Sequence, residues 1–151
     1  MSDLVYAVNQ ASVEDIRSHL AACDAQFSPP LSERTDLADY ARKLWTNAER
    51  FEAWQGSRLV GLVAMYCNDS AKTTAYVSNV SVDPALTRRG IARRLMAAAL
   101  TEAARLGFAR VSLAVDERAQ AALALYSSMG FARVARTGRM IEMRRIPKGQ
   151  L

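Results

Sequence analysis

Several kinds of residue are scarce in this 151-residue chain, and each shortage excludes a class of protein. There are two cysteines, Cys23 and Cys67, without CxxC spacing, and one histidine, His19. These are too few soft ligands for a zinc site, so no metal is expected. We expect both cysteines to be reduced packing residues and His19 to be an ordinary residue of an early helix. A catalytic Cys–His pair is the weaker alternative.

Long apolar runs are also absent. No stretch approaches the roughly 20 residues that a membrane-spanning helix needs. The first four residues, Met-Ser-Asp-Leu, lack the basic and then apolar order of a secretory signal. We therefore expect a cytoplasmic protein that does not associate with membranes.

Acidic side chains are fewer than basic ones, 15 against 20, which gives a net charge of +5 and favours anionic partners. Aromatic residues make up only 7%, and no basic run is interleaved with them, which argues against a nucleic-acid partner. The remaining composition, 50% hydrophobic and 23% charged, is that of an ordinary globular protein. Its length predicts one domain over residues 1–151.

Hydrophobic periodicity and turn residues predict short strands that alternate with helices. Strands are expected at 4–8, 50–54, 59–67, 73–82, 110–115, 131–134 and 140–144, and helices at 12–23, 36–48, from about 91 to Gly107, and 119–129. Residues 28–32 (Ser-Pro-Pro-Leu-Ser) form the clearest loop. This order indicates an α/β or α+β sheet that is covered on both faces.

The most informative stretch is residues 80–96, where a strand and a proline turn lead through a basic glycine turn directly into a helix. The N-terminus of a helix has four N–H groups without intrahelical partners and about half a positive charge. Gly90 lets an anion approach the backbone, and four arginines surround it: Arg88, Arg89, Arg93 and Arg94. The pattern predicts a phosphorylated cofactor, and ordinary packing with solvated arginines is an equally weighted alternative.

Two ordered motifs carry a resemblance to a known family. The first is the strand 80–84 (Val-Ser-Val-Asp-Pro) with the turn 88–92 (Arg-Arg-Gly-Ile-Ala), and the second is 125–131 (Leu-Tyr-Ser-Ser-Met-Gly-Phe), which matches L-Y-x-x-x-G-F. Over residues 50–145 the chain resembles the GNAT superfamily of acyl-CoA-dependent N-acyltransferases. The resemblance implies a mixed, mostly antiparallel central sheet, with helices on both faces and central strands 73–82 and 110–115 that splay apart.

The resemblance also implies acetyl-CoA as the cosubstrate, bound by backbone groups of the strand and the turn, with side-chain contacts from Arg88 and Arg93. The implied cofactor-binding residues are Val80, Ser81, Val82, Arg88, Arg89, Gly90, Ile91, Ala92 and Arg93. The chain departs from the family pattern at Thr87, where Gln or Arg is usual, and at Ala119, where Asn is common. These departures weaken the expected cofactor contacts without changing the identity of the cofactor.

Acetyl transfer needs an oxyanion donor, an acid and a base. The resemblance implies the backbone amide near Val80 as the donor and Tyr126 as the general acid for the leaving thiolate, whereas packing alone would make Tyr126 a core residue. The base is not evident, because Tyr76 and Ser78, expected to face the cleft, are poor bases at neutral pH. We expect either a water relay through Ser78, Asn79 or Tyr76, or the delivery of an amine that is already neutral. Three carboxylates remain as weaker candidates, each expected at the surface or in a turn: Asp69, Asp116 and Glu52.

The leading functional interpretation is an N-acetyltransferase that acts on a primary amine of a small molecule by direct attack in a ternary complex. A protein lysine or N-terminal acetyltransferase is the alternative enzyme. A CoA-binding sensor or interaction module without catalysis is the alternative outside enzymes. The family also makes a homodimer a reasonable expectation.

Overall fold

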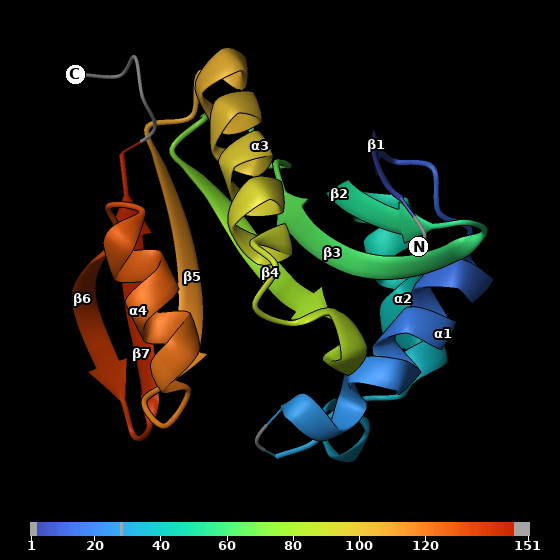
Figure 1. The fold of residues 1–151 in the computed structure, drawn as a ribbon. Coiled ribbons are helices and arrows are strands. Elements are labelled where there is room, and N and C mark those ends of the chain that lie inside the picture. The colour runs from blue at the N-terminus through green and yellow to red at the C-terminus, as the bar shows by residue number, and fades with distance from the viewer. Residues whose placement is uncertain (1–2, 28, 147–151) are drawn as a thin grey trace. The chain divides into compact units, whose positions relative to one another are not determined.

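The computed structural model describes residues 3–27 and 29–146 and contains seven strands and four α-helices (Figure 1). The strands are β1 Leu4–Val8, β2 Ala48–Gln55, β3 Arg58–Tyr66, β4 Thr74–Val82, β5 Arg110–Asp116, β6 Ala132–Thr137 and β7 Met140–Arg145. The helices are α1 Val13–Cys23, α2 Leu37–Asn47, α3 Ile91–Leu106 and α4 Gln120–Ser128. Of the expected loop 28–32, Ser28 lies outside the described residues and Leu31 begins a 3-10 turn that ends at Glu33.

The strands form one sheet in the order β1-β2-β3-β4-β5-β7-β6. The central pair β4 and β5 is parallel, with Thr74–Val77 against Arg110–Leu113, whereas the pairs β1–β2, β5–β7 and β6–β7 are antiparallel. This confirms the predicted mixed, mostly antiparallel sheet. One helix is shorter than expected: α2 ends at Asn47, because Ala48 already has the extended backbone (φ −106°, ψ 145°) of the strand it opens.

The described residues fall into two compact units, and β4 and α3 run from one into the other. We call residues 3–65 (without 28) and 79–99 the N-terminal unit, and residues 66–78 and 100–146 the C-terminal unit.

Local sequence signals begin both early helices of the N-terminal unit. The Ser12 side chain accepts a hydrogen bond from the Asp15 N–H while Asp15 caps the Ser12 N–H in return, which is a complete capping box. Asp36 accepts from the Asp39 N–H at the start of α2. These caps explain why the predicted starts of α1 and α2 were correct.

The first half of α3 packs against the sheet of the N-terminal unit at Gly61. A Cβ on Gly61 would lie 2.8 Å from Cγ2 of Ile91, 3.1 Å from Cβ of Ala53 and 3.2 Å from Cδ1 of Leu95. Only glycine lets the helix approach β3 this closely. On the other face of β2, Arg50 donates hydrogen bonds to carbonyl oxygens of α2. Helices therefore cover both faces, as expected.

In the C-terminal unit, α4 packs on one face of the strands. Arg145 Nε donates to the Met129 carbonyl oxygen just after α4, at 2.6 Å, and Arg145 pairs with Val111 on β5. The neighbouring positions in each strand point to the opposite face. That face carries Tyr76, Ser78, Ser112, Glu142 and Arg144, and we call these five residues the polar face.

Within residues 3–27 and 29–146, no helix is long and apolar enough to cross a bilayer. In the same residues there is no group of three or more His, Cys, Asp or Glu side chains placed to hold a metal ion. Cys23 is buried, Cys67 is partly buried, and neither forms a disulfide bond.

Candidate functional site

The glycine turn of the N-terminal unit is exposed and has an unusual backbone. Arg88 (φ 66°) and Gly90 (φ 76°) both adopt the left-handed conformation, which costs a non-glycine residue about 1 kcal/mol or more. A Cβ on Gly90 would meet nothing within 4 Å, so the space above the turn is open. Strain of this kind clusters at functional sites, which directs attention to this turn.

The turn leads into α3 so that amide groups remain available. The first intrahelical hydrogen bond joins the Arg94 N–H to the Gly90 carbonyl oxygen, at 3.0 Å. The N–H groups of Ile91 and Ala92 precede it in the helix and lie before the first α-helical acceptor. The first turn of α3 contains no acidic residue that would repel an anion. This geometry is suited to binding phosphate groups.

Arg94 is one of the four arginines around the turn, and its side chain is directed to the sheet. Its guanidinium lies over the ring of Tyr6 on β1, 3.8 Å from the ring centroid, in a cation–π contact. Arg88 and Arg89 are exposed in the turn itself. The charge near the open amides therefore comes from the turn arginines, and Arg94 fastens α3 to the sheet.

The last residues of β4 alternate between two environments. Val80 and Val82 are half-buried, whereas Asn79 and Ser81 are buried. The Ser81 Oγ lies 2.7 Å from Asn79 Oδ1 and 2.9 Å from His19 Nε2. The Ser81 side chain is thus committed inside the unit, and only its backbone remains for the predicted cofactor contact.

His19 is not an ordinary helix residue, contrary to the expectation from sequence. It is 2% exposed, and its Nδ1 lies 3.2 Å from the Leu59 carbonyl oxygen. Burial lowers the pKa of His19 to about 4, so the ring is neutral at pH 7. Because a carbonyl can only accept, Nδ1 carries the proton, and Nε2 faces the Ser81 hydroxyl, which donates to Asn79 Oδ1. Cys23 Sγ lies 3.7 Å from Nε2, but burial raises the pKa of this thiol to about 12, so the pair lacks a nucleophilic thiolate.

A surface pocket of about 240 Å³ lies beside this buried histidine. Its lining consists of Asp15, Ser18, His19, Ala22, Ser57, Arg58 and Leu59. None of the predicted cofactor-binding or catalytic residues belongs to it. The pocket therefore does not mark the predicted chemistry.

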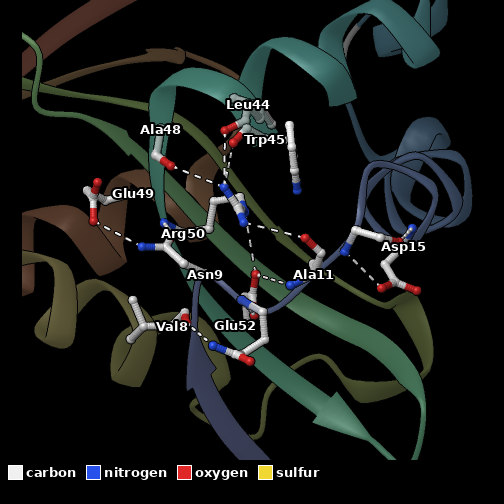
Figure 2. Close-up of polar contacts among 12 residues, drawn as sticks. Val8, Asn9, Ala11, Asp15, Leu44, Trp45, Ala48, Glu49, Arg50 and Glu52 are labelled. Carbon is white, nitrogen blue, oxygen red and sulfur yellow. Dashed lines mark hydrogen bonds and ion pairs between the residues drawn. The ribbon is translucent and has the colours of Figure 1, made fainter.

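Glu52 was expected at the surface or in a turn, and the structure corrects this: its side chain is fully buried (Figure 2). Its carboxylate accepts from the N–H groups of Gln10 and Ala11 at 3.0 and 3.1 Å, and lies 3.5 Å from Arg50 Nε. Arg50 Nη1 in turn donates to the Trp45 carbonyl oxygen at the end of α2, at 3.0 Å. The pair joins β2 to the start of α1 and the end of α2, and Glu52 cannot reach a substrate.

Tyr126, the predicted general acid, lies on α4 of the C-terminal unit and is 6% exposed. Its ring packs against Phe131 with centroids 5.9 Å apart, and burial raises the pKa of its phenol to about 12. Among the described residues of this unit, none forms a hydrogen bond with the phenol oxygen. The residue is both a packing aromatic and an available donor.

Tyr76 and Ser78 belong to the polar face, opposite the face on which α4 packs. Tyr76 is 41% exposed, and burial together with the nearby charge of Glu142 raises the pKa of its phenol. The Ser78 hydroxyl partly offsets the effect of burial on the pKa of Tyr66. The C-terminal unit thus places Tyr76 and Ser78 on one side of its strands and the helix of Tyr126 on the other.

Sequence reasoning missed three members of the polar face, Ser112, Glu142 and Arg144. Ser112 pairs with Tyr76 on β4 and with Arg144 on β7, and Glu142 pairs with Ala114. Alternation within the predicted strand 140–144 would have placed Glu142 and Arg144 on one face. The pairing of β7 with β5, which brings them to Tyr76, has no local signal.

Comparisons with known proteins agree with this fold. The model of the acetyltransferase (GNAT) family matches residues 14–131. No curated protein matches the chain.

Three solved structures illustrate the similarity in fold. A putative GNAT acetyltransferase from Desulfovibrio desulfuricans has a TM-score of 0.77 at 15% identity, covering 95% of this chain and 99% of that one. The ribosomal-protein-S18-alanine N-acetyltransferase from Escherichia coli has a TM-score of 0.76 at 20% identity, covering 95% of this chain and 94% of that one. A GNAT acetyltransferase from Elizabethkingia anophelis, solved with acetyl-CoA bound, has a TM-score of 0.71 at 14% identity, covering 97% of this chain and 99% of that one. Because the family model spans well over half of the chain and the fold agrees with it, the chain belongs to the GNAT acetyltransferase family.

Proposed function

We propose that the protein transfers the acetyl group of acetyl-CoA to a primary amine of a small molecule. The observation that carries the proposal is the turn at Gly90, where two left-handed residues open into a helix whose first N–H groups, those of Ile91 and Ala92, precede the first intrahelical hydrogen bond. A diphosphate is the ligand chemistry that such a turn favours. Membership of the GNAT family supports acetyl-CoA as its source.

The residues present fit this ligand. A Cβ at Gly90 would enter open space, so the backbone can be approached there, and the exposed Arg88 and Arg89 add positive charge. Backbone amides of Ile91 and Ala92 extend the same surface into α3. These groups would hold the diphosphate, and the backbone of Val80 and Val82 would hold the pantetheine arm.

The cosubstrate supplies an acetyl group activated as a thioester. In the transfer, the nitrogen of the neutral amine bonds to the acetyl carbon and loses one proton, while the C–S bond breaks and the sulfur gains a proton. An acceptor that arrives as an ammonium first releases one further proton to water. The backbone N–H near Val80 would stabilise the negative charge on the carbonyl oxygen. Tyr126 would give its phenolic proton to the sulfur.

The raised pKa of Tyr126 must be compared with that of the leaving thiol. A phenol at about 12 against a free thiol at about 8.5 would make the proton transfer uphill by about 5 kcal/mol. Burial raises the pKa of a thiol as well as that of a phenol. The buried Cys23 thiol of this chain is an example, with a pKa of about 12. In an equally dry site the two pKa values would approach each other, and donation becomes feasible.

Two measurements test the proposal. Acetyl-CoA at 100 times its Kd should stabilise the folded protein by about 2.7 kcal/mol, read as a rise in Tm, and S-acetylpantetheine, which has the thioester arm without the diphosphate, should not at the same concentration. A panel of small amines, screened for amine-dependent release of free thiol, should contain an acceptor. Thermal stabilisation without thiol release would instead identify a CoA-binding module, and absence of both would refute the proposal.

The same screen separates the two classes of acceptor. Peptides with a free N-terminus or a lysine are assayed beside the small amines at equal concentration, and acetylation is read as a mass increase. A kcat/KM at least tenfold higher for a peptide than for every small amine would replace the small-molecule assignment with a protein substrate.

A further inference from the structure

One row of side chains crosses three strands of the C-terminal unit on the polar face. Tyr76 on β4 pairs with Ser112 on β5, and Ser112 pairs with Arg144 on β7. One step along, Ala114 on β5 pairs with Glu142. Cross-strand partners point to the same side of a sheet, and diagonal neighbours lie within reach of long side chains. The Glu142 carboxylate, the Ser112 hydroxyl and the Tyr76 ring are therefore neighbours.

Ser112 is an unpartnered polar group in this row. It is 3% exposed, and its Oγ has no hydrogen-bond partner within the described structure. A buried hydroxyl without a partner costs about 1–3 kcal/mol. Its row neighbours, Tyr76 and Arg144, flank it on both sides. The hydroxyl lies on the polar face but its oxygen is covered, so a ligand could supply the missing hydrogen bond once the side chains over it move aside.

Glu142 adds a carboxylate with one uncommitted oxygen. Arg144 Nε donates to its Oε2 at 3.2 Å, and no described residue donates to its Oε1. The Glu142 side chain is 37% exposed, and Ala114 beside it has no side chain large enough to cover it. Glu142 is also close enough to help raise the pKa of the Tyr76 phenol. A donor that arrives from solvent can therefore reach Oε1.

We propose that the polar face binds the acceptor as a cationic amine, with its ammonium group donating to Glu142 Oε1 and Ser112 Oγ beside the ring of Tyr76. This inference rests on the proposed function and specifies its acceptor subsite. An ammonium has three N–H donors and no acceptor, which matches two oxygen acceptors and an aromatic face. An anionic ligand fits less well, because the guanidinium of Arg144 is already paired with Glu142.

Kinetics of Glu142→Gln test the inference, with the best acceptor of the amine panel as substrate. The variant keeps the size of the side chain but removes the charge, so a charge-assisted hydrogen bond worth about 1.5–3 kcal/mol is lost. We expect the KM for the amine to rise about tenfold to hundredfold, with the KM for acetyl-CoA and the Tm shift by acetyl-CoA unchanged. Glu117→Gln is the matched control, since Glu117 pairs with Arg136 outside the polar face, and both KM values should stay at wild type.

Ser112→Ala separates recognition from packing. If the hydroxyl serves the acceptor, the KM for the amine rises several-fold while the protein keeps or gains stability, because a buried unpartnered oxygen has been removed. An unchanged amine KM in both Glu142→Gln and Ser112→Ala would overturn the inference while amine-dependent turnover still supported the proposed function.

A binding experiment does not depend on turnover. Benzylamine, which is cationic at pH 7, and benzyl alcohol, which is neutral, are titrated into the ¹⁵N-labelled protein. The backbone amides of Tyr76, Ser112 and Glu142 should shift with benzylamine alone, and Glu142→Gln should abolish the shifts. Equal shifts with both ligands, or shifts elsewhere only, would refute the subsite. Specific shifts in a protein that acetylates no amine would retain the subsite and refute the proposed function.

Discussion

The imidazole Nε2 of His19 lies 2.9 Å from the hydroxyl oxygen of Ser81, which fastens α1 to the last residues of β4. The contact is buried, and Leu59 on β3 accepts from the other ring nitrogen. One histidine thus ties a helix and two strands together next to the backbone proposed to hold the pantetheine arm.

The neutral state of His19 predicts a pH dependence of stability. Its pKa is about 4 in the folded state, with Asp83 and Arg58 as the nearby charges, and about 6.5 in the unfolded state. Because the unfolded state takes up the proton first, stability is retained above pH 6.5 and falls as the pH drops to 4, by about 3 kcal/mol. In His19→Gln, the denaturant concentration at the midpoint of unfolding should depend less on pH between 4 and 6.5 than it does in the wild type. Parallel curves for the two proteins would show that His19 does not titrate this way.

The role of the glycine turn is tested with two aspartate substitutions. Gly90 (φ 76°) and Gly56 (φ 60°) are both left-handed and both have nothing within 4 Å of an added Cβ. Either substitution should therefore cost a similar amount, about 1–2 kcal/mol of unfolding free energy. Only Gly90→Asp places a negative charge at the proposed diphosphate site, so only this variant should lose the Tm shift by acetyl-CoA. Retention of that shift in Gly90→Asp would remove the turn from cofactor binding.

Substitution of the phenol on α4 should separate chemistry from binding. Tyr126→Phe keeps the contact with Phe131 and removes an oxygen without a described hydrogen bond, so the Tm should change by no more than a few degrees. We expect kcat to fall about 10²–10⁴-fold with the KM for acetyl-CoA unchanged. Tyr6→Phe makes the same chemical change on β1 and should leave kcat intact. A wild-type kcat in Tyr126→Phe would exclude the acid role.

The pKa of Tyr126 adds a second readout. The pKa of the Tyr126 phenol is about 12, so the phenol stays protonated between pH 7 and 10. Ionisation of Tyr126 should therefore cause no fall in the wild-type kcat over this range. A fall of kcat near pH 10 that occurs in the wild type and is absent in Tyr126→Phe would contradict this.

Glu52 should be important for stability and not for chemistry. Glu52→Ala leaves Arg50 as an unpaired buried charge and removes the acceptor of two backbone N–H groups, at a cost of about 3–5 kcal/mol in chemical denaturation. Glu49→Ala is the control on the same strand, since Glu49 bonds the exposed side chain of Asn9, and should cost less than about 1 kcal/mol. The kcat per folded molecule should remain near wild type in both. A selective loss of kcat in Glu52→Ala would return Glu52 to the list of candidate bases.

The predicted elements were close to the observed ones where the signal is local. The strand Leu4–Val8 was predicted with its observed bounds, and α1 begins directly after the predicted cap at Ser12. The glycine turn was recognised because a glycine flanked by arginines lies directly before a helix start, all within a few residues. Side-chain roles were predicted less well. His19 and Glu52 were both misjudged, because their burial depends on segments that lie about 40 residues away in the chain.

By itself, the sequence of this protein determined its strands, its helices, its family and the turn suited to a diphosphate, because caps, periodicity and glycine conformations act within a few residues. Only the tertiary structure decided which polar groups meet. The pairing of β5 with both β4 and β7 brings Tyr76, Ser112 and Glu142 together, and strand pairing is selected by the packing of the whole sheet, which no local pattern records.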